Sequence, residues 1–255
     1  MINQSNGDGC VAGVKTFVRN RHFYGKLMDV LHFEQEQNYF NEKRWLLNRL
    51  VMGYGVVCGL GVEVGQDGAS VVVLPGVAID RWGREVVVPS ASPPVALPVL
   101  PPGTPQNECD ETNCFHLVLC YRECQSDPVP ALGGDCDRDV LCSPGSIRER
   151  YELSFQPGRV PDVSVDCTVA DLVAGSRINY PALAEYVSAP CPSCPDDSCI
   201  ALANVRVPPA GTKLDAEQIN IASRPLVYTA DLLHDLLICL TGKASTQDHS
   251  RGGKS

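Results

Sequence analysis

The sequence predicts an α+β fold that is mainly antiparallel β, with an N-terminal amphipathic helix and a short C-terminal helix. Three observations lead to this class. Apolar residues recur with helical period in residues 30–47, segments of alternating apolar residues follow, and a second short helical pattern occurs in 228–242. The chain also contains 22 glycines and 20 prolines but only 6% aromatic residues, which favours strands and turns over a helical bundle.

The first helix is predicted to span about 18 residues, beginning near Asp29 or His32 and ending before Gly53 and Gly55. Its apolar stripe contains Phe33, Phe40, Leu46, Leu47, Leu50 and Val51. Polar residues cover the remaining surface, among them Lys43, Arg44 and Arg49. They are expected either to face solvent or to contact a partner.

The next segment, residues 56–88, is predicted to form a meander of three antiparallel strands. Turns are expected at "GQDGA" (65–69) and at "DRWGRE" (80–85), where Gly83 lies. Alternation places Cys58 on the same face as Val56 and Leu60. We therefore predict that Cys58 is a small buried hydrophobic residue.

The second half of the chain is predicted to hold further strands. Residues 114–124 and 146–155 alternate clearly, with a loop between them, and 199–207 is an apolar strand expected to pair with 114–124. A short strand is expected within 214–223, and a helix in 228–242 begins at Thr229. The predicted organisation is a flexible arm (1–22), a helix and β-meander module (23–90), a proline-rich strap (91–108), a cysteine-rich β domain (109–242) and a disordered tail (243–255).

Composition narrows the partners. A formal net charge of -9 and a pI near 5.0 argue against nucleic-acid binding. The longest apolar runs are too short to span a bilayer, so no membrane insertion is expected. The first residues do not form a signal-peptide pattern, which predicts a cytoplasmic location and reduced thiols.

Cysteines are the most unusual feature. Ten of the 13 lie between Cys109 and Cys199, and "PCPSCPDDSC" (190–199) has C-x2-C-x4-C spacing. A C-x2-C loop can present two sulfurs to one tetrahedral zinc ion. A structural zinc clamp is therefore predicted, joining the loop after 114–124 to the start of 199–207. Its candidate ligands are Cys124, Cys136, Cys142, Cys191, Cys194 and Cys199.

Other states of these cysteines remain open. Disulfides are disfavoured by the expected compartment and by the odd number of cysteines. Redox catalysis is disfavoured because Pro195 and two acidic residues follow Cys194, which would raise a thiol pKa. Free thiols and another metal are the remaining alternatives.

Catalytic motifs were not found. The sequence lacks G-x-S-x-G, a P-loop, a dinucleotide-binding G-x-G-x-x-G and H-E-x-x-H, and its five histidines do not cluster. His116 is expected to be a hydrogen-bonded histidine of a sheet. The chain is therefore predicted not to be an enzyme, with a zinc-dependent hydrolase and an unrelated cytosolic zinc-binding adaptor as the alternatives.

One long stretch resembles a known family. The segments "FYGKLMDVLHFEQEQNYFNEKRWLLNRLVMGYGVVCGLGVEV" and "VLPGVAIDRWGREVVVPS" are similar to bacterial proteins associated with phage-tail-like contractile injection systems. The matching positions are Tyr24, Gly25, Lys26, Leu27, Phe33, Glu36, Gln37, Tyr39, Arg44, Asn48, Arg49, Gly53, Gly55, Val56, Val57, Gly59, Leu60, Val62, Pro75, Gly76, Ala78, Asp80, Gly83, Arg84 and Glu85. Position 32 differs from the family pattern, which has an acidic residue before the helix where this sequence has His32. The difference affects the capping of the helix and not the expected role of the protein.

The resemblance covers roughly residues 20–160, including "YREC", "DPVPAL" and "IRERYEL" in the middle of the chain. It implies a structural baseplate, cap or adaptor component. Its partners would be other subunits of a tail-like assembly and further copies of itself within the particle. It implies no catalytic residues.

Overall fold

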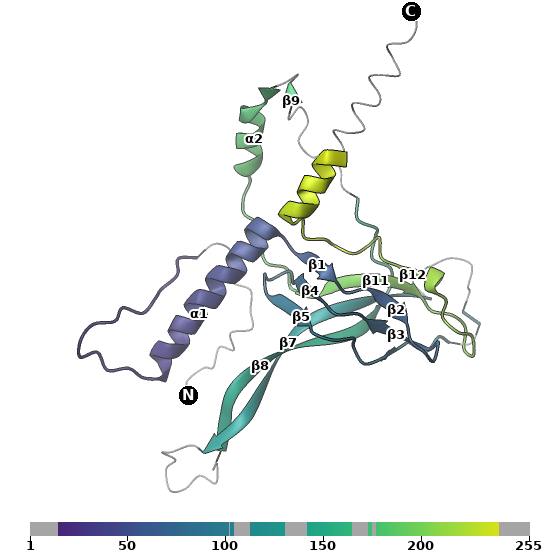
Figure 1. Ribbon diagram of the computed structural model, residues 1–255, viewed down its shortest axis with the longest axis horizontal. Coiled ribbons are helices and arrows are strands. Elements are labelled where there is room, and N and C mark those ends of the chain that lie inside the picture. The colour runs from purple at the N-terminus through teal and green to yellow at the C-terminus, as the bar shows by residue number, and fades with distance from the viewer. Residues whose placement is uncertain are drawn as a thin grey trace, which may run out of the picture.

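The computed structural model describes residues 15–101, 103–104, 113–130, 142–164, 173–174 and 177–239. Within these ranges the protein has the predicted α+β fold, and its named strands pair in antiparallel fashion. Figure 1 shows the sheets gathered in one body, with helix α1 beside it and a long hairpin projecting away. The predicted arm at 1–14 and tail at 243–255 lie outside the described residues.

Helix α1 (Val30–Leu47) has the predicted length and start. Asp29 caps it, because its carboxylate accepts the backbone N–H of His32 at 3.2 Å, while His32 Nδ1 accepts the backbone N–H of Asp29 at 3.3 Å. A short π-helical turn, η1 (Asn48–Met52), continues it to Gly53, whose φ of 79° ends the helix. No side chain of α1 is buried.

The predicted three-stranded meander is instead five strands divided between two sheets. Strands β1 (Gly55–Gly59), β4 (Gly76–Ile79) and β5 (Glu85–Val88) form one sheet in the order β1-β4-β5. The backbone leaves β1 at Gly59 and Leu60, whose φ angles of 66° and 56° interrupt the extended conformation.

The other three-stranded sheet has the order β2-β3-β6. Strands β2 (Val62–Val64) and β3 (Ser70–Val73) flank the predicted 65–69 turn, and β6 (Val95–Ala96) comes from the proline-rich strap. The short β6 is an edge strand, the position in which a proline-rich segment is tolerated.

Cys58 is exposed, so the prediction that it is buried was wrong. The register between β1 and β4 shifts between Val56 and Cys58. Such a bulge reverses the face on which later side chains lie, and strict alternation does not reveal it.

The largest sheet has the order β12-β11-β7-β8. Strands β7 (Cys114–Pro130) and β8 (Cys142–Pro157) are longer than predicted, and β11 (Ile200–Arg206) pairs with β7 as expected. Part of the predicted loop after residue 124 is therefore strand. The end of the β7–β8 hairpin is exposed and projects from the body (Figure 1), and we call residues 122–130 with 142–150 the hairpin arm.

One hydrophobic cluster lies among the three larger sheets. Its buried members are Val56, Leu60, Val71, Val73, Ala78, Val86, Val88, Leu117, Leu119, Tyr121, Ile200, Leu202, Ala203, Val205 and Leu214. These residues come from both the predicted helix and meander module and the predicted cysteine-rich domain. The two parts therefore share buried contacts, whereas their division into domains stays a prediction.

The remaining described elements are short. They are β9 (Val173–Ala174), β10 (Arg177–Ile178), α2 (Tyr180–Val187), η2 (Ala216–Gln218) and β12 (Ile219–Asn220). The C-terminal helix occupies residues 230–239, and Thr229 Oγ1 caps it by accepting the backbone N–H of Leu232 at 3.3 Å. Among the described helices, none is long and apolar enough to cross a membrane.

Candidate interaction site

The turn between β4 and β5 is built around Asp80. Its Oδ1 atom accepts the backbone N–H groups of Trp82 at 2.9 Å and Arg84 at 2.8 Å, and its own N–H donates to the Arg84 carbonyl at 2.8 Å. Gly83 supplies the φ of 92° that closes this turn. The sequence "DRWGR" thus fixes a tight hairpin.

The Arg84 side chain fills the inner side of this turn. Its Nε donates to Asp80 Oδ2 at 2.8 Å, and its terminal nitrogen donates to Ser198 Oγ at 2.9 Å. The guanidinium carbon lies 4.6 Å from the centre of the Trp82 ring and 4.5 Å from that of Tyr121, as in cation–π contacts. Burial raises the pKa of Asp80, and the Arg84 charge and the backbone N–H donors oppose that rise.

The same turn holds the cysteine loop. The indole nitrogen of Trp82 donates to the Pro195 carbonyl at 2.8 Å, and the backbone N–H of Arg81 donates to the Ser198 carbonyl at 3.1 Å. From the helix side, Arg49 donates to the Pro192 carbonyl at 3.0 Å. Direct hydrogen bonds from the hairpin and η1 therefore position residues 192–198.

The end of α1 is fastened to the turn as well. Asn48 Nδ2 donates to the Gly83 carbonyl and to Glu85 Oε1, both at 2.9 Å, and Arg44 Nε lies 3.1 Å from Glu85 Oε1. A Cβ atom at position 83 would overlap the Trp45 carbonyl oxygen. Helix and hairpin thus meet backbone to backbone, which only glycine permits here.

These contacts form one structure, which we call the hub: the β4–β5 turn, the end of α1 with η1, and residues 192–198. Seven of its residues are among those that carry the sequence resemblance, namely Arg44, Asn48, Arg49, Asp80, Gly83, Arg84 and Glu85. Of the three basic residues of α1 and η1, Arg44 and Arg49 therefore make contacts within the hub. Lys43 is exposed and lies 5.0 Å from the Tyr39 ring centre.

The predicted zinc ligands have other environments. Cys199 forms a disulfide with Cys120 of β7, with a Cα–Cα distance of 4.5 Å, and Cys194 is also in a disulfide. A disulfide sulfur is not a thiolate and does not serve as the zinc ligand that we predicted. The expectation of reduced thiols was wrong at these positions, because β11 pairs with β7 in the register that brings Cys199 beside Cys120.

Three further candidates carry free, exposed thiols: Cys124, Cys142 and Cys191. Cys124 pairs with Arg148 on the hairpin arm, whereas Cys142 pairs with Pro130, six residues farther out. At about 3.3 Å per residue, roughly 20 Å separate them, so these two cannot share one ion. Cys136 lies outside the described residues, and within the described part no cluster of three metal-ligating side chains occurs.

His116 is hydrogen-bonded, as predicted. One ring nitrogen lies 2.9 Å from the Gly158 carbonyl and the other 3.2 Å from Gln156 Oε1. Both nitrogens are therefore engaged between neighbouring strands, which leaves this histidine a structural role in the sheet.

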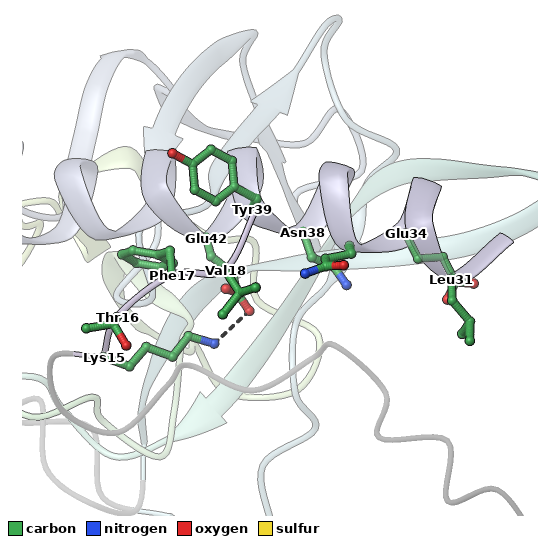
Figure 2. A pocket seen from close by; sticks show the side chains of 10 residues that line it. Lys15, Thr16, Phe17, Val18, Leu31, Glu34, Asn38, Tyr39 and Glu42 are labelled. Atoms are coloured by element: carbon green, nitrogen blue, oxygen red, sulfur yellow. Dashed lines mark hydrogen bonds and ion pairs between the residues drawn. The ribbon is translucent and has the colours of Figure 1, made fainter. Parts of the chain in front are cut away.

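Helix α1 presents two different sides. The segment 15–18 lies along one of them, where Lys15 forms a 2.9 Å ion pair with Glu42 and Phe17 meets Tyr39 edge to face (Figure 2). Between segment and helix is a groove of about 360 Å³, lined partly by Glu34 and Asn38. The other side carries the apolar stripe, in which Phe33, Phe40 and Leu47 are 57%, 63% and 60% exposed.

Comparison with known proteins assigns no family. No family model matches the sequence, and no curated protein matches it. Among solved structures, a chain from a crystal structure of TssK matches with 10% identity and a TM-score of 0.37, over 78% of this chain and 40% of that one. This chain therefore spans less than half the length of that TssK chain. A TM-score at this level does not establish a shared fold.

Proposed function

We propose that this protein is a non-catalytic structural subunit of a contractile injection system or phage-tail-like particle assembled in the cytoplasm. It acts through contacts with other subunits. The sequence resemblance over residues 20–160 supports the type of particle, and the meeting of seven of its residues in the hub supports a structural role for that motif.

The observation that carries this proposal is the exposure of α1. The helix has 18 residues and no buried side chain, and the large apolar side chains of Phe33, Phe40 and Leu47 are exposed on one side of it. Isolated helices of this length are marginal in water, because most helix stability in proteins comes from packing an apolar face. A subunit that completes this packing inside an assembly explains both the stripe and its exposure in the single chain.

The hub explains how the helix is presented. Hydrogen bonds from Asn48 and the ion pair from Arg44 hold the C-terminal end of α1 against the β4–β5 turn. The turn in turn holds the cysteine loop through Trp82 and Arg84. A rigid base with a helix projecting from it suits a subunit that docks on a neighbour.

The proposal is tested by recovering assembled particles from cells that make a tagged full-length chain. The chain is expected to sediment with sheath and tube proteins. A triple variant, Phe33→Ser, Phe40→Ser and Leu47→Ser, should remain folded but leave the particle fraction. A matched control, Val129→Ser with Ile147→Ser on the hairpin arm, should stay in it. Wild-type chain that never accompanies sheath or tube proteins would refute the proposal.

A structural zinc ion is a second proposal, for the cysteine-rich part. It would use the free thiol of Cys191 with that of either Cys124 or Cys142, and it requires further ligands such as Cys136, which lies outside the described residues. Protein purified anaerobically with reductant should then contain zinc and lose structure when a chelator is added. Metal-free, folded protein would refute it. That result would also remove the zinc-dependent hydrolase and the unrelated zinc-binding adaptor, which both require the ion.

A further inference from the structure

We propose that the apolar stripe of α1 binds the same stripe of a second copy of this chain, with the two helices antiparallel about a two-fold axis at Phe40. This inference names one partner of the surface on which the proposed function rests. It can fail while the chain remains a subunit of a particle.

The spacing of the stripe is self-complementary. Phe33 and Leu47 lie seven residues before and after Phe40, and a seven-residue step returns almost to the same side of a helix. A two-fold axis at Phe40 therefore places Phe33 of one copy against Leu47 of the second copy. Each copy contributes the same surface, as a two-fold interface requires.

Charge selects the antiparallel direction. Residues 29–38 contain Asp29, Glu34 and Glu36 and no lysine or arginine. Residues 39–49 contain one acidic residue and three basic ones, of which Lys43 is not engaged at the hub, whereas Arg44 pairs with Glu85 and Arg49 donates to Pro192. Parallel helices would bring acidic half against acidic half. Antiparallel helices bring each acidic half against a basic half, which favours association.

One pair of charges is placed especially well. Glu36 precedes Phe40 by four residues and Lys43 follows it by three, so the 3.6-residue period puts both on the same side of the stripe. In the antiparallel pair, Glu36 of each copy lies beside Lys43 of the second copy. In a parallel pair, the two-fold axis would place these side chains of the two copies on opposite sides of the contact, so the Glu36–Lys43 pairing would be lost.

The position of the body also permits this pairing. The C-terminal end of α1 is attached at the hub, and its N-terminal end stands away from the sheets (Figure 1). Antiparallel helices therefore place the two bodies at opposite ends of a pair about 27 Å long, at 1.5 Å per residue. In the described N-terminal segment, residues 15–18 lie next to Glu42, and His22 lies 3.5 Å from Glu36 at the edge of the stripe. Phe33, Phe40 and Leu47 nevertheless stay more than half exposed.

The area predicts a weak dimer. Aromatic side chains bury about 150–250 Å² each when covered fully, so the half-exposed stripe offers on the order of 300–400 Å² per copy. Stable complexes bury about 800 Å² per partner. We therefore expect a weak dimer that dissociates on dilution, with fuller pairing where an assembly concentrates the chains.

The experiment is sedimentation of the full chain over a wide concentration range, with exposed thiols alkylated to prevent disulfides between chains. Wild type is expected to dimerise, and Phe40→Glu should weaken dimerisation about tenfold or more by opposing two charges at the axis. Ile147→Glu on the hairpin arm is the matched control, because Ile147 is 64% exposed and Phe40 63%. It should dimerise like wild type.

Charge exchange tests the direction. Glu36→Lys and Lys43→Glu should each weaken the dimer about threefold to fivefold, and the double variant should recover wild-type affinity. Failure of the double variant to recover would overturn the antiparallel arrangement.

Photo-crosslinking identifies the occupant. A Phe40→p-benzoylphenylalanine variant should link position 40 to α1 of a second copy. Linkage to residues 1–14 of the same chain, linkage to a different protein only, or a monomer at every concentration would overturn the proposal. Sedimentation with sheath and tube proteins would persist in each of these cases if the proposed function alone is correct.

Discussion

Arg84 Nε lies 2.8 Å from Asp80 Oδ2 in a site where the Asp80 side chain has no exposed surface. The pair joins the two ends of one hairpin turn, and Arg84 also contacts residues outside that turn. Arg84 also donates to Ser198, and its charge lies against Trp82 and Tyr121. Because a buried charge is stable only in an arrangement that satisfies it, this pair selects one relative position of the turn, β7 and the cysteine loop.

The first prediction is that Arg84→Met destabilises the protein strongly. The substitution leaves Asp80 buried without its counter-charge, and breaking such a pair costs about 3–5 kcal/mol. Urea denaturation followed by circular dichroism measures the loss. Arg148→Met is the control, because Arg148 forms a 2.8 Å pair with Asp127 in which both side chains are at least half exposed. It should cost far less than Arg84→Met because water screens this exposed pair, and equal losses would contradict the assignment.

The second prediction concerns pH in the same variant. Without the guanidinium, the pKa of Asp80 in the folded protein rises further above 3.8. The folded state then holds that proton more tightly than the unfolded state does. The contribution of protonated Asp80 to the stability of the folded variant is fully present below pH 3.8, and it is lost as the pH rises through the pKa of Asp80 in the folded state. The stability gap between Arg84→Met and wild type should therefore widen from acidic to neutral pH, and a constant gap would argue against it.

The third prediction compares two glycines with similar backbones. Gly83 has φ 92° and Gly211 has φ 84°, but a Cβ at 83 would overlap the Trp45 carbonyl, whereas nothing lies within 4 Å at 211. Gly211→Ala should cost about 1–2 kcal/mol from backbone strain alone. Gly83→Ala should cost roughly 1–3 kcal/mol more, because the helix must move away. Denaturation curves that show equal losses would mean that this contact does not hold α1.

The first helix shows what sequence patterns determine. Its bounds follow from local signals, since Asp29 supplies the cap and Gly53 the positive φ that ends it. Cys58 shows the limit. Alternation predicted burial, but the bulge after Val56 depends on pairing with β4, which is not encoded locally.

The candidate site was less accessible to prediction than the helix. Asp80 and Arg84 could be recognised in the sequence as parts of one motif. The hydrogen bond from Arg84 to Ser198, however, joins residues that are 114 positions apart, and no local pattern predicts it. The disulfide depends on register in the same way. Cys120 and Cys199 were placed on two strands expected to pair, yet only the register puts them side by side. The expected cytoplasmic location argued against disulfides, but the register of β7 and β11 places these two cysteines close enough to form one.

The fourth prediction is that the Cys120–Cys199 disulfide stabilises the largest sheet. Peptide mapping of protein prepared without reductant should recover the two cysteines in one linked peptide. Replacing both by alanine should cost about 2–4 kcal/mol, because the bond closes a long loop in the unfolded chain. Cys124→Ala removes an exposed free thiol and should change stability by less than about 0.5 kcal/mol. Mapping that finds Cys199 as a free thiol would contradict the pairing.

The fifth prediction separates the hub from the fold as a whole. Trp82→Phe keeps a ring against Arg84 but removes the indole N–H that donates to the Pro195 carbonyl. Loss of one such bond costs about 0.5–1.5 kcal/mol, so the protein should stay folded. Amide hydrogen exchange should accelerate in residues 191–198 and at Arg81, whose N–H donates to Ser198, but not in β7 or β8. Uniform acceleration would mean that Trp82 supports the whole sheet, and no change would mean that the loop is held without it.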